Sequence, residues 1–428
     1  MIYHSLKSKI FRGLKSSYLK NISTQVIGSG FAQILPLLIM PFLARIYSAE
    51  EFAGYTSFMA IIGILSVAVG GRYYMAIVLP KTNEEANSVF TLSIFLTLIY
   101  SIVLLLFVLI YYNFFKVGSF EISYLIIPFY IFFYGVWLSL INFSIRLKKF
   151  KVNAFSKIFQ SFINSISTIS FGLIKLSSGL IIGRLVGILS ASIFLKFKFK
   201  KLLVLDSVSN LKFFMKKYKN FPIYGILPSF LDAASLQAPV FAIEYFFTKE
   251  ILGHFGLTII VLSAPLSVLS VAFKDVFYQK VAELYNLGDG FKIRKVFLNS
   301  AILLLIIGIP FGFIVHFFGE SIFSIIFGKE WIKSGKYAEI LIFSFIIKLV
   351  VSPLSSIFNI FNKQRIISLW QGLYFITTLT TIFLSVSVFK LTIDLFLVMY
   401  VSHELVLYLT YFYLQLNLIN KNQHLCVE

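Results

Sequence analysis

Three basic side chains stand inside long apolar runs of the sequence, where a charge is costly and needs a reason. Arg72 lies in VGGRYYMAIVLP, Arg184 in SGLIIGRLVGILSASIF and Lys348 in LIFSFIIKLVVSP. Guanidinium and ammonium groups bind phosphate oxygens strongly, and a low-dielectric cavity strengthens that attraction. Arg45 ends an earlier run, where it either reaches outward to water or joins the same group. These four side chains are our candidates for binding an anionic substrate.

Two acidic side chains in apolar runs, Asp232 and Glu404, are candidates for titrating or for binding a cation such as H+ or Na+. The alternative for each charge is internal pairing, for example Lys348 with Glu404 or Asp232 with an arginine. The basic groups inside the runs outnumber these two acids, so pairing still leaves a positive excess. The charges therefore favour an anionic substrate over a cationic one.

The remaining chemistry of the sequence does not favour an enzyme. There is no Walker A motif, no nucleophile elbow and no paired-acid motif on a loop. His254 and His316 stand at the ends of apolar runs, which is typical of interfacial side chains rather than metal ligands. The single cysteine, Cys426, excludes a disulfide framework. We expect no catalytic residue, no metal and no cofactor.

The elements that carry these charges are expected to be apolar helices. Of the 428 residues, 58% are hydrophobic and 13% are charged, and the mean hydropathy is +0.89. So high an apolar content is typical of a polytopic membrane protein, whose spans need about 20 helical residues each. We predict an all-α integral membrane protein with twelve transmembrane helices over 21–44, 52–79, 87–110, 122–143, 153–174, 178–196, 221–243, 250–272, 297–318, 337–361, 366–389 and 393–417. The fifth run is the most polar, so we expect it to face protein or water.

The distribution of basic residues predicts the orientation of these spans. Lys and Arg fall mainly in alternate connections, beginning with the N-terminal segment MIYHSLKSKIFRGLKSSYLK. Positive residues collect on the cytoplasmic side of a membrane, so both termini are expected there. The net charge of +20 is then mainly a topology signal, and we expect no nucleic-acid partner. We interpret the first apolar run as a retained span, not a cleaved signal peptide.

A polar break recurs in the sequence at an offset of 200 residues. In LARIYSAEEFAGYTSF, Ser48 and Glu50 correspond to Thr248 and Glu250 of IEYFFTKEILGHFGLT. Serine and threonine suit the N-cap of a helix, and Ser48 with Glu51 has the pattern of a capping box. The break is therefore expected to start the second and the eighth spans.

The repeat divides the chain into two parts of the same topology. We expect six-helix lobes over 1–196 and 221–428, joined by the basic cytoplasmic segment 197–220. Parallel repeats of this kind are related by a pseudo-two-fold axis along the membrane normal, and transporters built from two repeats bind substrate between them near the midplane. A cationic central cavity is the expected site.

Four stretches together resemble a known family: GRYYMAIVLPKTNEEAN, KKYKNFPIYGILPSFLDAASLQAPV, APLSVLSVAFKDVFYQKVAELYNLGD and FGKEWIKSGKYAEIL. Their order and spacing are similar to those of the polysaccharide or O-antigen flippases of the multidrug/oligosaccharidyl-lipid/polysaccharide exporter superfamily, over about residues 20 to 415. The resemblance implies a protein of the bacterial inner membrane that works by alternating access. It implies transport of an undecaprenyl-diphosphate-linked sugar unit from the cytoplasmic to the periplasmic leaflet, with H+ or Na+ coupling.

The resemblance also bears on individual residues and partners. It implies phosphate or sugar contacts for Arg45 and Arg72, whereas Tyr74 stands where the family often has an acidic residue. The implied partners are membrane lipids, the lipid-linked oligosaccharide and, further along the pathway, a polysaccharide polymerase and a chain-length regulator.

Two alternatives stay open. A cation-coupled multidrug exporter of the same superfamily would need an acidic, aromatic pocket, and the basic interior argues against one. A membrane-embedded polysaccharide polymerase or glycosyltransferase commonly uses a long external loop, and the longest outside connection that we expect, roughly 319–336, is short.

Overall fold

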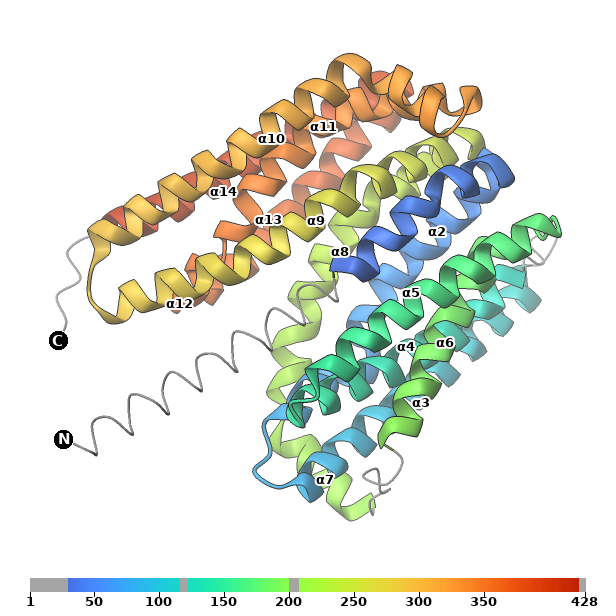
Figure 1. Cartoon of the computed structure of the whole chain (residues 1–428). Coiled ribbons are helices and arrows are strands. Elements are labelled where there is room, and N and C mark those ends of the chain that lie inside the picture. Colours follow the sequence, from blue (N-terminus) through green and yellow to red (C-terminus); the bar gives the residue numbers. More distant parts are fainter. Residues whose placement is uncertain (1–29, 116–121, 200–207, 423–428) are drawn as a thin grey trace. The chain divides into compact units, whose positions relative to one another are not determined.

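The computed structural model describes residues 30–115, 122–199 and 208–422, and these residues are almost entirely helical (Figure 1). Ten helices of the described chain are long and apolar enough to cross a membrane. Each of the twelve predicted runs overlaps a described helix, although the start of the first, 21–29, lies outside the described residues. The chain is therefore a multi-pass, all-α membrane protein, as predicted.

Two of the predicted spans are not among these ten helices, each for a visible reason. Gly30–Ile46 is a shorter apolar helix. α5 (Phe150–Leu173) has the length of a span but buries a face of Asn, Ser and Thr side chains. One of them, Ser161, donates to the carbonyl oxygen of Ala32 at 2.8 Å. The fifth span faces protein, as its composition predicts.

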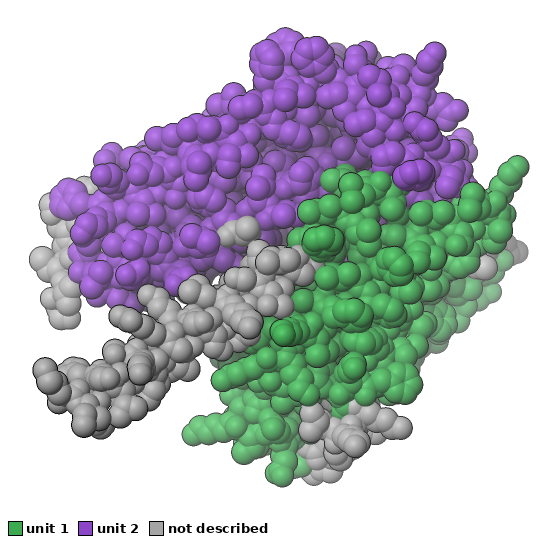
Figure 2. Space-filling view, in the orientation of Figure 1, with its two compact units in different colours: residues 1–39, 65–226 green, residues 40–64, 227–428 purple. Residues whose placement is uncertain are grey.

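The helices form two compact units, coloured separately in Figure 2. Of the described residues, unit 1 comprises 30–39, 65–115, 122–199 and 208–226, and unit 2 comprises 40–64 and 227–422. Besides α5, the elements of unit 1 are η1 (Ser66–Val78), α3 (Asn83–Phe115), α4 (Ile122–Arg146), α6 (Gly179–Phe199) and α7 (Val208–Lys217).

The second unit holds the longest helices of the chain. α8 (Asn220–Phe246) begins in unit 1 and continues in unit 2. The other elements of unit 2 are α2 (Ala49–Leu65), α9 (Lys249–Asn286), α10 (Gly290–Ile326), η2 (Lys329–Trp331), α11 (Ile332–Leu354), α12 (Ile357–Ile360), α13 (Gln364–Phe383), η3 (Leu384–Val388) and α14 (Ile393–Lys421).

The boundary of the compact units differs from the boundary of the lobes that the repeat predicts. Residues 40–64 belong to unit 2, although they precede most of unit 1 in the sequence. Trp331 shows why, because its Nε1 donates to the carbonyl oxygen of Ala44 at 2.7 Å. The ring of Trp331 also packs edge-on against Phe52 at a centroid distance of 5.0 Å. The division into two six-helix lobes stays a prediction.

Both copies of the repeated polar break begin a helix, as predicted. At the start of α2, the Glu51 amide donates to Ser48 Oγ at 3.3 Å and the Ser48 amide donates to Glu51 Oε2 at 2.7 Å. This reciprocal pair is the predicted capping box. At the start of α9, Thr248 Oγ1 accepts from the Ile251 amide at 3.3 Å.

α2 and α9 occupy equivalent places in the repeat and touch each other within unit 2. A Cβ atom added at Gly253 would lie 1.8 Å from the carbonyl oxygen of Ala49. A Cβ atom added at Gly256 would lie 1.9 Å from Thr56 Oγ1. Both distances are far below van der Waals contact, so this helix crossing requires residues without a side chain.

The second span is interrupted at Val69–Arg72, inside η1. Val69 has ψ of 130°, and the next three residues, Gly70, Gly71 and Arg72, are left-handed with φ of 55°, 55° and 60°. Glycine adopts this conformation readily, whereas an arginine held there costs about 1–3 kcal/mol. A Cβ atom at Gly70 would also lie 2.7 Å from Ser93 Oγ of α3. The two glycines therefore allow close packing against α3. They also allow the break in the helix, which the sequence does not predict.

Candidate functional site

Arg72 lies at this break and contacts the start of α8. Its Nη1 donates to the carbonyl oxygen of Gly225 at 2.9 Å, and its Nη2 lies 3.5 Å from Met75 Sδ. Gly225 leaves room for this approach, since an added Cβ would lie 3.0 Å from Arg72 Nε. The guanidinium is a planar fork of five N–H donors, a geometry that matches the oxygens of a phosphate.

Tyr73, the next residue, contacts the helix that leads into α8. Its hydroxyl donates to the carbonyl oxygen of Met215 on α7 at 3.0 Å, and Tyr73 as a whole is only 3% exposed. Two consecutive residues of the broken segment thus hold two consecutive helices, Arg72 holding α8 and Tyr73 holding α7.

Arg184, half-buried on α6, belongs to the same unit as Arg72. Two tyrosines link the two arginines electrostatically. Tyr134 of α4 interacts with both Arg184 and Tyr74. Tyr74 in turn interacts with Arg72. The phenol of Tyr74 is a hydrogen-bond donor that can bind an anion, whereas a carboxylate at this position would repel one. We call Arg72, Tyr74, Tyr134 and Arg184 the basic cluster of unit 1.

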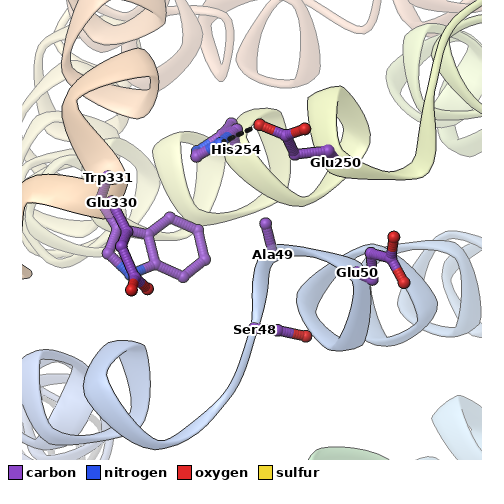
Figure 3. A pocket seen from close by; sticks show the side chains of 7 residues that line it. All are labelled: Ser48, Ala49, Glu50, Glu250, His254, Glu330 and Trp331. Carbon is purple, nitrogen blue, oxygen red and sulfur yellow. Dashed lines mark ion pairs between the residues drawn. The ribbon is translucent and has the colours of Figure 1, made fainter.

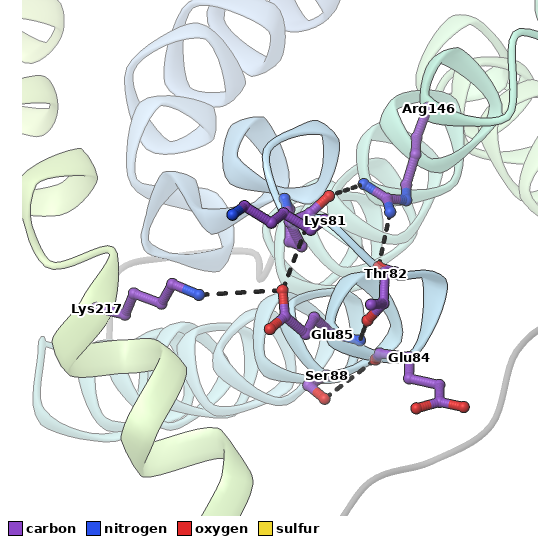
Figure 4. A network of polar contacts seen from close by, with 8 residues as sticks. Lys81, Thr82, Glu84, Glu85, Ser88, Arg146 and Lys217 are labelled. Carbon is purple, nitrogen blue, oxygen red and sulfur yellow. Dashed lines mark hydrogen bonds and ion pairs between the residues drawn. The ribbon is translucent and has the colours of Figure 1, made fainter.

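The C-terminal end of the second span is fixed by Arg146 at the end of α4 (Figure 4). Arg146 Nη1 donates to the carbonyl oxygen of Pro80, and Nη2 donates to that of Thr82, both at 2.6 Å. Its Nε donates to Asn83 Oδ1 at 3.2 Å. The turn between η1 and α3 is therefore tied to α4 by one side chain.

The same turn is linked to α7 through Glu85. Glu85 Oε2 accepts from the Lys81 amide at 3.3 Å and lies 4.0 Å from Lys217 Nζ (Figure 4). The Lys217–Glu85 ion pair is partly exposed, so on its own it contributes little to folding stability. Together with the hydrogen bond from Tyr73, it places α7 against the C-terminal end of the broken span.

Lys348 of α11 and Glu404 of α14 form an ion pair within unit 2, so the pairing considered from the sequence is realised. The Glu404 side chain is fully buried, whereas 22% of the Lys348 side chain is exposed. Ser344 and Tyr374 also donate to Glu404, and the Tyr400 hydroxyl donates to Glu404 Oε1 at 2.9 Å. The carboxylate thus has three hydroxyl donors and one ammonium, which is the satisfaction that a buried charge requires.

Asp232 and His403 accompany this pair. Asp232 of α8 interacts electrostatically with Lys348. The His403 ring stacks on Tyr374 at a centroid distance of 6.3 Å, and its two nitrogens have no hydrogen-bond partner among the described residues. We call Asp232, Lys348, His403 and Glu404 the charge cluster of unit 2.

A pocket of about 340 Å³ lies at the start of α2 and α9, beside η2 (Figure 3). It is lined by Ser48, Ala49, Glu50, Glu250, His254, Glu330 and Trp331. The two repeat-equivalent carboxylates, Glu50 and Glu250, both line it, and this equivalence is the signal in the sequence that points to the pocket. Among the residues that the structure describes, no group of His, Cys, Asp and Glu is arranged to hold a metal ion.

His254 in this pocket corrects one expectation. It is only 3% exposed and not an interfacial side chain, because its Nδ1 lies 3.0 Å from Ser334 Oγ. Its Nε2 lies 3.5 Å from Glu250 Oε1, which also pairs with Lys333 at 2.7 Å. Ser334 and Lys333 come from α11, which sequence spacing alone does not bring to α9.

The sequence-predicted site residues therefore fall into three places. Arg72 and Arg184 share the basic cluster of unit 1. Lys348, Asp232 and Glu404 share the charge cluster of unit 2. Arg45 is an exposed side chain at the end of the Gly30–Ile46 helix.

Comparisons with known proteins give the family and the fold. The sequence profile of a family described as polysaccharide biosynthesis protein matches residues 42–336, which is more than half of the chain. Among curated proteins, none matches the chain in sequence. Solved structures of the same fold share 14–16% of residues with it, so they inform on architecture alone.

Three of these structures cover nearly the whole chain. The lipid II flippase MurJ, in an inward closed conformation, is 16% identical over 93% of this chain and 89% of its own, with a TM-score of 0.70. An inward-facing multidrug resistance MATE family transporter of the MOP superfamily is 14% identical over 94% and 95%, with a TM-score of 0.63. A MOP superfamily transporter from Pyrococcus furiosus, whose binding pocket is described as having reverse polarity, is 14% identical over 94% and 96%, with a TM-score of 0.61. With this fold and the profile match, the chain belongs to the polysaccharide biosynthesis protein family.

Proposed function

We propose that this protein is a flippase for an undecaprenyl-diphosphate-linked O-antigen or polysaccharide repeat unit, which it moves from the cytoplasmic to the periplasmic leaflet. The family supports a role in polysaccharide synthesis, and the fold is that of secondary transporters rather than enzymes. The observation that carries the proposal is the basic cluster of unit 1, where Arg72 lies at a break in a membrane span. Broken spans are where transporters of other families place their substrate sites.

In this proposal the diphosphate binds at Arg72 and Arg184, with Tyr74 as an additional donor. Arg72 already donates to the Gly225 carbonyl, and a phosphate oxygen is a stronger acceptor for the same guanidinium because it is charged. Arg45 and Lys348, which belong to unit 2, are further proposed contacts for the anionic substrate, and the lipid tail stays in the bilayer. Substrate binding thus competes with the contact that holds the start of α8, which links binding to movement of the segment between the units.

Asp232 and Glu404 are the groups that we propose to bind H+ or Na+ during the cycle. Both lie in the charge cluster of unit 2, within reach of Lys348. We further propose an inner-membrane location with both termini cytoplasmic, on the basis of the basic connections, and delivery of the substrate to a polymerase and its chain-length regulator.

Surface display of the polysaccharide in cells tests the proposed function. Arg72→Ala removes a charge-assisted contact worth about 1.5–3 kcal/mol, so we expect transport to fall by about tenfold to a hundredfold at equal protein level. Lys363→Gln removes one positive charge from an exposed position outside both clusters and serves as the matched control. Display by the Arg72→Ala protein that equals the control would overturn the assignment of Arg72.

A multidrug exporter is the rival function. Its cationic substrates would need an available carboxylate in the interior, and Glu404 is occupied by Lys348 and three hydroxyl groups. Drug-resistance profiling of cells with and without the protein separates the two functions, since the proposed flippase confers no resistance to cationic drugs.

A further inference from the structure

Lys348 is the exposed end of a pair whose other member is sealed from solvent. Glu404 is 0% exposed, while Lys348 presents 22% of its side chain. The Lys348 Nζ lies 5.7 Å from the ring centroid of Tyr408 and 5.9 Å from that of Phe345. The ammonium is therefore held by one carboxylate and two aromatic faces, and a flexible four-carbon stem allows it to leave.

The two members of the pair respond differently when they separate. The ammonium can be neutralised by another anion, because it reaches an accessible surface. The carboxylate cannot follow, and a buried carboxylate without a counter-ion is strongly disfavoured. The least costly compensation available to Glu404 is a proton, since its three hydroxyl donors already occupy the space around the oxygens.

We propose that an anionic diphosphate and Glu404 compete for Lys348, so that binding of one diphosphate lipid is accompanied by uptake of one proton at Glu404. This inference rests on the proposed function. The exchange is balanced: the Lys348 ammonium leaves the Glu404 carboxylate for a phosphate oxygen, and a proton from solvent joins the carboxylate to give a carboxylic acid. No covalent bond to carbon or phosphorus changes.

Other charged and titratable groups of the charge cluster bear on this exchange. Asp232 of α8 interacts electrostatically with Lys348 and is the competing destination for the ammonium. His403 has two buried ring nitrogens with no hydrogen-bond partner among the described residues and is the competing destination for the proton. Tyr374, Tyr400 and Tyr408 surround Glu404 as neutral donors or rings. A single substitution removes each of these competing groups, so its contribution to proton uptake can be measured separately from that of Glu404.

Calorimetric titration of the purified full chain with undecaprenyl diphosphate tests the inference. Titration in two buffers of different ionisation enthalpy gives the number of protons taken up per lipid bound. The phosphate groups of the lipid contribute protons of their own, and this contribution cancels when wild type is compared with Glu404→Gln. We expect wild type to take up about one proton more than Glu404→Gln, while His403→Gln matches wild type.

A second variant keeps the test decisive if Glu404→Gln does not fold. In Lys348→Met, Glu404 has no ammonium partner and is already protonated before the lipid binds. Lipid binding to this variant should therefore take up about one proton fewer than binding to wild type. Equal proton uptake by wild type and these variants, with lipid bound by all of them, would overturn the inference and leave the proposed function intact. Uptake lost in His403→Gln instead would overturn it as well. Folded wild-type protein that binds no undecaprenyl diphosphate would overturn the proposed function together with the inference.

Discussion

Removal of the Lys348 ammonium is expected to destabilise the protein in a way that depends on pH. In Lys348→Met, the fully buried Glu404 keeps three hydroxyl donors and loses its counter-ion. Breaking a buried ion pair by removing one partner typically costs about 3–5 kcal/mol. Because three donors remain on the carboxylate, we expect the lower end of that range, about 3 kcal/mol, near neutral pH.

The sign of the pH dependence follows from the proton that replaces the ammonium. In the variant, folded Glu404 binds a proton more readily than unfolded Glu404 does, so the folded state is favoured by acid. The stability deficit relative to wild type should therefore shrink as the pH falls from about 8 to about 5. Thermal unfolding of the detergent-purified proteins across this range measures it.

A double variant separates the charge from the packing. Lys348→Met with Glu404→Gln has no buried charge to compensate, so it should recover most of the lost stability at all pH values. A single variant as stable as wild type at about pH 8, or a deficit that does not change with pH, would refute the reasoning.

Three further predictions concern backbone and packing in the two units. Arg72→Gly should be more stable than Arg72→Ala by about 1 kcal/mol, because only glycine adopts the left-handed conformation of residue 72 without cost, and equal unfolding midpoints would contradict the broken span. Gly253→Ala should lose about 1–3 kcal/mol or more of folding stability, since its Cβ would lie 1.8 Å from the Ala49 carbonyl oxygen. Gly372→Ala, with nothing within 4 Å of its Cβ, should be neutral or stabilising. Equal effects of the two substitutions would argue against the crossing of α2 and α9. Tyr73→Phe should lose about 0.5–1.5 kcal/mol with the bond to Met215, and a protease-accessibility assay on α7 that gives the wild-type pattern would exclude Tyr73 as its anchor.

Much of the architecture follows from the sequence because a bilayer leaves few choices. Apolar runs of spanning length predict the helices, and the capping pattern of Ser48 and Glu51 predicts where α2 begins. The pairing of Lys348 with Glu404 is open in the sequence as an alternative to separate binding roles, and the structure contains it, since a buried charge is stabilised by an opposite one. The polar fifth span packs against protein for the same physical reason.

Other features depend on contacts that a single sequence does not contain. The left-handed run that ends at Arg72 reads as close helix packing in the sequence, because a glycine pair is equally typical of either. The burial of His254 depends on Ser334, which is 80 residues away. The assignment of residues 40–64 to unit 2 depends on side-chain contacts such as that of Trp331 with Ala44.

Movement of a labelled undecaprenyl-diphosphate oligosaccharide between leaflets of a liposome tests the central claim most directly. The purified protein is reconstituted, and exposure of the sugar at the opposite leaflet is followed beside Arg72→Ala and Lys363→Gln. The account predicts exposure that requires the protein, persists in Lys363→Gln and falls by at least about tenfold in Arg72→Ala. No exposure with folded wild-type protein and its cognate sugar, or equal exposure in all three, would contradict it.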